Sequence, residues 1–192
     1  MHTSSRRTYH LIAAALVAAL MAVCSWISFP LPITQIPITL GTLGAMLAGI
    51  LIGPVWGTIG VLVFLLLGAA GAPVFHGVSG GIGILVGPTG GYLVGYLFIS
   101  LITGFFAWYL SGKEQVRRRV FTMVIVGGAL GTAVCYLLGT IWFMRLQHMA
   151  LMPALAACVF PFLPGDAIKI VVAALLSFRL MKLVRSNLPI SR

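Results

Sequence analysis

The charged residues of this sequence lie almost entirely between or beyond long apolar segments. Hydrophobic residues make up 60% of its 192 residues and charged residues 7%, whereas a soluble domain carries about 25% charged residues. A membrane-spanning helix needs about 20 consecutive, mainly apolar residues. We therefore predict an all-α integral membrane protein, a single membrane domain over residues 1–192 with about six transmembrane helices joined by short loops.

Proline and glycine mark the ends of these apolar segments. Pro30 ends the first segment, and the Gly53-Pro54 pair indicates a tight turn after the second. The predicted helices cover about 9–29, 38–52, 55–70, 89–110, 120–143 and 165–184. Residues 30–37 are expected to form a rigid external loop able to cover a pocket, and residues 144–163 a less regular external segment.

The basic residues are grouped rather than scattered. All but Arg145 and Lys169 fall in three clusters: Arg6 and Arg7; Lys113, Arg117, Arg118 and Arg119; and Arg179, Lys182, Arg185 and Arg192. With six spans the three clusters lie on one side of the membrane, which is the pattern of cytoplasmic loops. We therefore expect a multi-pass plasma-membrane protein with both termini in the cytoplasm, a basic face against anionic lipid headgroups, and no nucleic-acid partner.

A glycine-rich stretch interrupts the apolar pattern between the third and fourth predicted helices. Residues 71–96, GAPVFHGVSGGIGILVGPTGGYLVGY, cannot form one regular helix, yet they are too apolar for an ordinary soluble loop. Such backbone persists near the membrane only where protein or a water-filled cavity satisfies its polar groups. Glycine also lets backbone approach a ligand closely. We predict an external substrate-holding loop; its GPTGGY portion could bind an anion through backbone N–H groups or form a plain re-entrant turn.

The segment FLPGDAIKI places two ionisable residues at the start of the last predicted helix. Asp166 falls in the first turn, where the helix macrodipole favours an anion, and Lys169 follows three residues later on the same face. Ionisable residues inside membrane segments are costly and usually functional. The pair could bind a small ligand that offers both an amide-like N–H and an acid. The alternative is an ion pair that only locks this helix.

Small residues recur along the first predicted helix. Ala14, Ala18 and Ala22 lie four residues apart, with Ala15 and Ala19 in a neighbouring row. Small residues at this spacing let a second helix pack closely in lipid. The row could contact a separate protein or another helix of the same bundle.

The sequence offers little support for catalysis. Its histidines and its three cysteines, Cys24, Cys135 and Cys158, are isolated, so we expect neither a metal site, a cofactor nor a disulfide. No phosphate-binding loop of the nucleotide-binding type occurs. Gly77-Val78-Ser79-Gly80 matches the GxSG of rhomboid intramembrane proteases, but those enzymes need a histidine on the sixth helix to activate the serine, and none occurs there.

Three motifs together resemble the BioY family, the biotin-binding S component of energy-coupling factor (ECF) transporters. They are the glycine-rich stretch 71–96, the PGDAIK motif that opens the last predicted helix, and IPITLGTLGAMLAGILIG at the second. The resemblance covers nearly the whole chain. It implies a six-helix, S-component-like fold that captures biotin at the outer surface and has no enzymatic activity. It also implies partnership with a transmembrane coupling subunit and two ATPase subunits.

The resemblance also assigns roles to individual residues. Asp166 would accept a ureido N–H of biotin, and Lys169 would either pair with the valerate carboxylate or position Asp166. Ser79, Gly80, Gly81 and Tyr92 would line the pocket, and the Ala14, Ala18 and Ala22 row would dock on the coupling subunit. Relatives often carry glutamine where this chain has Gly41; Gln35 is a candidate replacement. A second hypothesis is an S component or facilitator for another small vitamin.

Overall fold

The computed structural model describes residues 2–30, 32, 34, 36–110 and 116–187, and within them the chain is almost entirely helical. The long helices are α1 (His2–Trp26), α2 (Gly41–Ile52), α3 (Pro54–Ala69), α5 (Gly90–Phe105), α6 (Arg117–Gln147) and α8 (Leu163–Asn187). Shorter elements are β1 (Ser28–Phe29), β2 (Ile38–Thr39), η1 (His76–Val78), α4 (Ile82–Val86), η2 (Phe106–Leu110) and α7 (Leu151–Cys158). Gln35, Lys113 and Arg192 lie outside the described residues.

Each predicted span coincides with one long helix, although the bounds differ. The fourth continues α5 through the π-helical turn η2, and the fifth, α6, is extended at both ends relative to the prediction. By length and hydropathy, 90–110 and α6 qualify as spans, and α7 with α8 qualifies as one span bent by 51°. Residues 11–26 of α1, α2 and α3 are apolar but shorter. The count of six spans therefore stays a prediction.

Two regions expected to be irregular contain regular structure. Residues 144–163 include the helix α7, and the glycine-rich stretch includes η1 and α4. A short antiparallel hairpin, absent from the prediction, joins α1 to α2 by pairing Ser28 with Thr39 and Phe29 with Ile38. This hairpin fixes where α2 begins and brings Thr39 toward the interior of the bundle.

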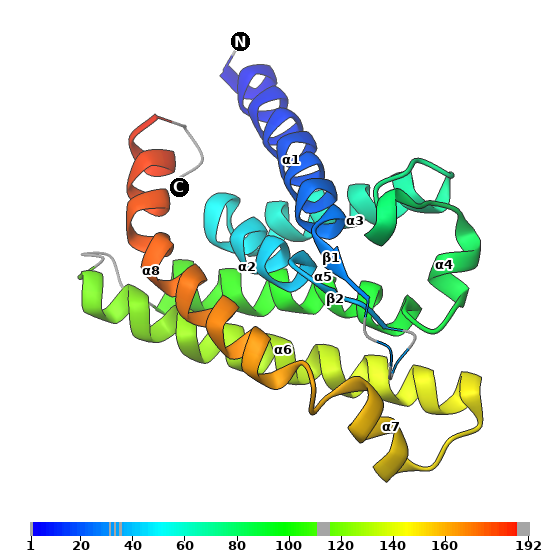
Figure 1. Cartoon of the computed structure of the whole chain (residues 1–192). Helices are drawn as coiled ribbons and strands as arrows, with labels where there is room; N and C mark the ends of the chain where they lie inside the picture. The colour runs from blue at the N-terminus through cyan, green and yellow to red at the C-terminus, as the bar shows by residue number, and fades with distance from the viewer. Residues whose placement is uncertain (1, 31, 33, 35, 111–115, 188–192) are drawn as a thin grey trace.

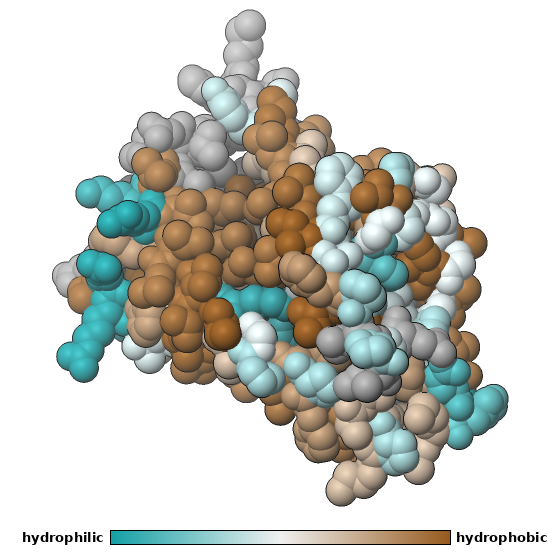
Figure 2. Space-filling model, viewed as in Figure 1, coloured by the Kyte–Doolittle hydropathy of each residue, from teal (hydrophilic) through white to brown (hydrophobic). Residues whose placement is uncertain are grey.

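In Figure 1, α5 and α6 run side by side across the molecule, with α8 crossing α6 and α2 lying against α5 and α8. The start of α1, the end of α8 and the start of α6 lie at the top and left of the view, and α4 and α7 lie at the right. The space-filling view shows a broad hydrophobic face over these helices (Figure 2), as expected of a surface in contact with lipid.

Glycines spaced four residues apart bring α5 and α6 into backbone contact. A Cβ at Gly95 would lie 2.5 Å from Cys135 Sγ and 2.9 Å from Cys135 Cα. Gly91 similarly faces Gly139, and Gly131 faces Ile99. Such close approach lets dispersion contacts stabilise helix pairs that lipid would otherwise separate. The glycine faces of the two helices thus pack against one another.

The alanine row of α1 packs within the bundle. Ala14, Ala18 and Ala22 are each at most 6% exposed. Their helix meets α3 at Gly60, where a Cβ would lie 3.1 Å from the carbonyl oxygen of Ala14. This placement favours the internal helix contact over partner docking for this row. The neighbouring residues Ala15 and Ala19 are exposed.

Replacing Gly95 by valine is expected to separate α5 from α6. Its side chain would overlap Cys135 on a backbone that cannot recede, and overpacking of this kind costs about 1–3 kcal/mol. We expect a lower thermal unfolding temperature for Gly95→Val in detergent. Gly83→Ala is the matched control, because nothing lies within 4 Å of a Cβ built at Gly83. Equal stability of both variants with the parent protein would contradict this packing.

Candidate functional site

A small cavity lined by both apolar and polar side chains lies where α2, α5, α6, α7 and α8 meet. Its volume is about 40 Å³. Its lining combines aromatic rings, hydroxyls and one acid–base pair: Ile36, Pro37, Thr39, Thr42, Tyr92, Tyr96, Cys135, Tyr136, Cys158, Phe162, Asp166 and Lys169. In Figure 2, hydrophilic surface is recessed between hydrophobic side chains near the middle of the view, over α2 and α8.

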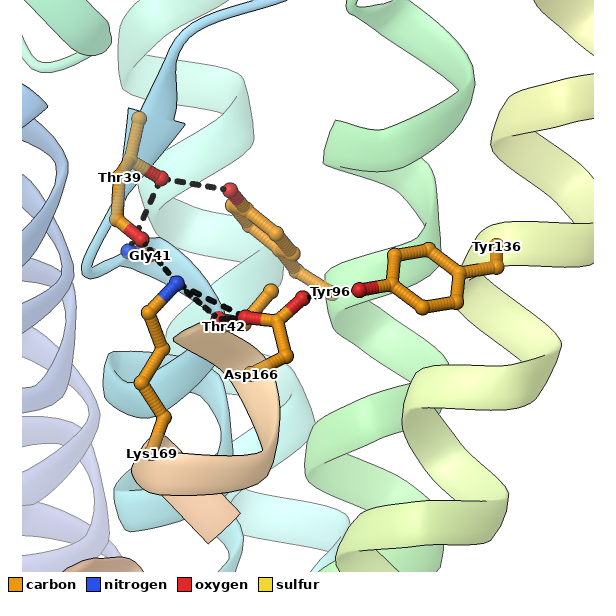
Figure 3. A network of polar contacts seen from close by, with 7 residues as sticks. All are labelled: Thr39, Gly41, Thr42, Tyr96, Tyr136, Asp166 and Lys169. Atoms are coloured by element: carbon orange, nitrogen blue, oxygen red, sulfur yellow. Dashed lines mark hydrogen bonds and ion pairs between the residues drawn. The ribbon is translucent and has the colours of Figure 1, made fainter. Parts of the chain in front are cut away.

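Asp166 is the centre of this site. It lies in the first turn of α8 and is 4% exposed. Its Oδ1 accepts hydrogen bonds from Lys169 Nζ at 2.8 Å and Thr42 Oγ1 at 2.9 Å, and its Oδ2 accepts one from Tyr136 Oη at 2.5 Å. Burying an ionised carboxylate is costly unless it is paired and hydrogen-bonded. Here residues from α2, α6 and α8 supply those partners (Figure 3).

Lys169 is held as firmly as its partner. Besides the ion pair with Asp166, its ammonium donates to the carbonyl oxygen of Thr39 at 2.6 Å and to Thr42 Oγ1 at 3.2 Å. An ammonium has three N–H donors, and these three acceptors match that number. Thr42 both accepts from Lys169 and donates to Asp166, so its hydroxyl closes a triangle of polar groups.

Gly41 is required by the ring of Tyr96. A Cβ at position 41 would lie 2.5 Å from Tyr96 Oη and 2.8 Å from the ring carbon Cζ. The Tyr96 hydroxyl exchanges a hydrogen bond with Thr39 Oγ1 at 3.2 Å, and Thr39 Oγ1 also accepts the Gly41 N–H. The phenol ring of Tyr96 therefore fills the space, and forms the part of the cavity wall, that a longer side chain at position 41 would take (Figure 3).

Tyr92, one helical turn before Tyr96 on α5, contributes a second aromatic ring to the lining. Its ring lies directly against Gly139 of α6, which has no Cβ to exclude it. Its hydroxyl contacts Thr140 Oγ1 at 3.3 Å and donates to the carbonyl oxygen of Cys158 at 3.3 Å. The structure thus brings Tyr92 together with Asp166 and Lys169, as the resemblance implies.

Ser79, Gly80 and Gly81 lie elsewhere. They are absent from the cavity lining. Ser79 Oγ donates to the carbonyl oxygen of His76, Gly80 packs against the backbone of Ala72, and the Gly81 N–H bonds to the carbonyl oxygen of Gly68 at 2.7 Å. Their contact with a substrate stays a prediction that this geometry does not support.

Two tryptophans donate hydrogen bonds to backbone carbonyls of the glycine-rich stretch. Trp26 Nε1 donates to the carbonyl oxygen of Pro73 at 2.8 Å, and Trp142 Nε1 donates to that of Gly87 at 2.9 Å. Within the stretch, burial lowers the pKa of the His76 imidazole, so this side chain is neutral at pH 7. The stretch therefore supplies no fixed charge with which to bind an anion.

Four polar residues of the site were not singled out from sequence: Thr39, Thr42, Tyr96 and Tyr136. The sequence signal that could have identified them is a hydroxyl group inside an otherwise apolar segment. Their partners, however, lie 30 to 130 positions away in the chain. Among the described residues, no group of three histidine, cysteine or acidic side chains is placed to hold a metal ion.

Comparison with known proteins identifies the family of this chain. The model of the BioY family matches residues 1–186. The chain belongs to the BioY family. The biotin transporter BioY of Thermotoga maritima is 37% identical over 173 residues, which cover 90% of this chain and 96% of that protein. The BioY of Rhodobacter capsulatus is 38% identical over 152 residues, covering 74% and 77% of the two chains.

Solved structures agree with this assignment. The crystal structure of an S component for biotin from an ECF-type ABC transporter superposes with a TM-score of 0.82 and 30% identity, covering 95% of both chains. The S component of another bacterial ECF transporter, at 18% identity, has the same fold with a TM-score of 0.61. The chain is therefore a membrane protein with the S-component fold. Membership in a transporter family also removes the basis for the rhomboid protease alternative.

The effects of substituting Asp166 and Lys169 on protein stability should depend on one another. Lys169→Met leaves Asp166 buried without its cation, a loss that costs about 3–5 kcal/mol in buried pairs. Replacing both residues, as Asp166→Asn with Lys169→Met, removes the uncompensated charge and is expected to restore much of that stability. The measurement is the free energy of unfolding in mixed micelles for the two single variants and the double variant. Strictly additive losses would show that the two side chains do not interact.

Proposed function

We propose that this protein captures biotin as the substrate-binding S component of an ECF-type transporter. The observation that carries the proposal is the buried Asp166–Lys169 pair at the cavity of a chain with the fold of the biotin S component. Several curated members of its family are named biotin transporters. Uptake would be energised by partner ATPase subunits, because this sequence has no nucleotide-binding loop of its own.

Asp166 is suited to bind a ureido N–H. A carboxylate offers about four lone-pair positions, and three donors already use two positions on Oδ1 and one on Oδ2. The remaining position on Oδ2 can accept an N–H from the ligand. A hydrogen bond to a charged group contributes about 1.5–3 kcal/mol. The same position repels a carboxylate, so the ligand presents its amide-like end here.

Lys169 acts as a positioning residue for Asp166. All three of its N–H donors have acceptors within the protein, and a direct bond to the valerate carboxylate would require one to be given up. Of the two roles implied by family resemblance, these contacts favour positioning. The aromatic walls from Tyr92 and Tyr96 then supply apolar surface for the ring system of the ligand.

Biotin capture requires the cavity to widen. Sites for small molecules usually enclose about 300–1,000 Å³, far more than the present 40 Å³. Regular structure in this wall is broken at the bend between α7 and α8, which carries Phe162. We propose that movement at this bend admits the ligand, and that binding energy is partly used to hold the wider state.

In the proposed orientation, both termini lie in the cytoplasm and the cavity faces the outer surface of the membrane. The starts of α1 and α6 and the end of α8 carry the basic clusters, and α4 and α7 lie away from them in Figure 1. Six spans in a single domain follow if α1, α2 and α3 cross the membrane despite their short apolar lengths. A plasma-membrane location, lipid contact at the basic face and absence of nucleic acid belong to the same proposal.

Docking on a transmembrane coupling subunit is assigned to the exposed side of α1. Since Ala14, Ala18 and Ala22 are buried, the available small residues are Ala15 and Ala19. Close approach of a partner helix in lipid needs small residues at such four-residue spacing. The coupling subunit and two ATPase subunits would then complete the transporter.

Biotin titration by calorimetry tests the proposed substrate. We expect tight binding by the purified protein and about 10- to 150-fold weaker binding by Asp166→Asn, the equivalent of 1.5–3 kcal/mol. Ser79→Ala is the matched control; its hydroxyl bonds only to the loop in this structure, so its affinity should stay within about threefold, below 0.7 kcal/mol. No binding of biotin, with binding of another vitamin in a panel, would reassign the substrate.

Bulky residues on the exposed face of α1 should separate capture from transport. Ala15→Trp with Ala19→Trp is expected to abolish association with the coupling subunit, because a large side chain keeps a partner helix at a distance. Biotin binding by the isolated subunit should be unchanged. The readout is co-purification of the coupling subunit alongside a binding titration. Normal association would move the docking surface to another helix.

A further inference from the structure

A second and much larger hollow lies at the other end of α8. It is a groove of about 460 Å³ between the start of α6 and the second half of α8. Its lining is apolar except for two arginines: Val116, Arg117, Arg118, Phe121, Ala174, Leu175 and Phe178. Ala174 lies about 12 Å along the helix axis from Asp166, at 1.5 Å per residue, so this groove is separate from the biotin site.

The groove has a cationic end and an apolar body. Arg117 and Arg118, in the first turn of α6, form the cationic end. In Figure 2, hydrophilic side chains at the left of the view, where α6 begins, border the continuous hydrophobic face. The first-turn N–H groups of a helix as long as α6 also favour a negative group at this position.

No carboxylate within the described part of the chain neutralises these arginines. The one acidic residue there is Asp166, which is bound to Lys169 and Tyr136 at the far end of α8. Both arginines are exposed and can pair with an anionic group from outside the protein. Since α6 is long and apolar enough to span a membrane, its first turn lies at a membrane surface, where phospholipid phosphates are available.

We propose that this groove binds one anionic phospholipid. Its phosphodiester contacts the guanidinium groups of Arg117 and Arg118, which match phosphate oxygens in bidentate geometry. One acyl chain lies along Phe121, Leu175 and Phe178. A free phosphate satisfies only the cationic end and leaves the apolar body exposed, whereas a phospholipid matches both. The site anchors the junction of α6 and α8 to the membrane surface and is independent of the proposed biotin function.

Native mass spectrometry of the purified chain tests the site directly. The probes are dioleoylphosphatidylglycerol and dioleoylphosphatidylcholine, which share acyl chains and differ in net charge. We expect selective retention of the anionic lipid, weakened about tenfold or more in Arg117→Gln with Arg118→Gln, the scale of two basic contacts to anionic lipid. The control, Arg119→Gln with Arg179→Gln, removes the same charge from positions outside the lining and should retain binding.

Three outcomes would overturn the proposal. Equal loss of anionic-lipid binding in the two double variants would indicate a diffuse charge effect. Equal retention of both lipids by the parent protein would show that charge plays no role. Displacement of the lipid by inorganic phosphate would indicate an ion site. Circular dichroism and gel filtration report folding of each variant. Leu175→Gln, at a position 56% exposed, is a second test if the arginine variant fails to fold; undiminished binding of the anionic lipid would contradict a seated acyl chain.

Discussion

The structure depends on keeping one carboxylate charged inside an apolar bundle. Asp166 is almost fully buried, and every described donor around it comes from a different part of the chain: Thr42 from α2, Tyr136 from α6 and Lys169 from its own helix. An unpaired charge at this depth would be unfavourable by several kcal/mol. The network therefore fixes the relative positions of α2, α6 and α8, and the proposed ligand site results from the same contacts that hold the helices.

Helix packing supplies the geometry that this network needs. Glycines on α5 and α6 bring the two helices close enough for Tyr92 to lie against Gly139, and Gly41 allows the ring of Tyr96 to approach the start of α2. Larger residues at these positions would push the aromatic rings away from the acid–base pair. The space left by the absent side chain at Gly41 is thus filled by the ring of Tyr96.

Local patterns in the sequence predicted the helices and the Asp166–Lys169 pair. Each depends on residues a few positions apart, where helix geometry fixes the neighbours. Thr39, Tyr96 and Tyr136 could not be placed in this way, because their roles depend on contacts between distant segments. The alanine row shows the same limit. Spacing identified small-residue faces for close packing, but rows one residue apart differ by about 100° around a helix. The row assigned to a partner, Ala14, Ala18 and Ala22, is the buried one.

The hydrogen-bond inventory of the site also defines what a ligand must offer. Lys169 has no unused donor, and Asp166 retains an acceptor position on Oδ2. A ligand that presents an N–H therefore completes the network. A ligand that presents a carbonyl or carboxylate oxygen at the same point leaves that oxygen and Asp166 Oδ2 without a hydrogen bond to each other. Sites built to hydrogen-bond a particular group discriminate strongly against analogues that lack it. The charge that orders the helices would in this way select a urea-like N–H over an ester or acid of similar shape.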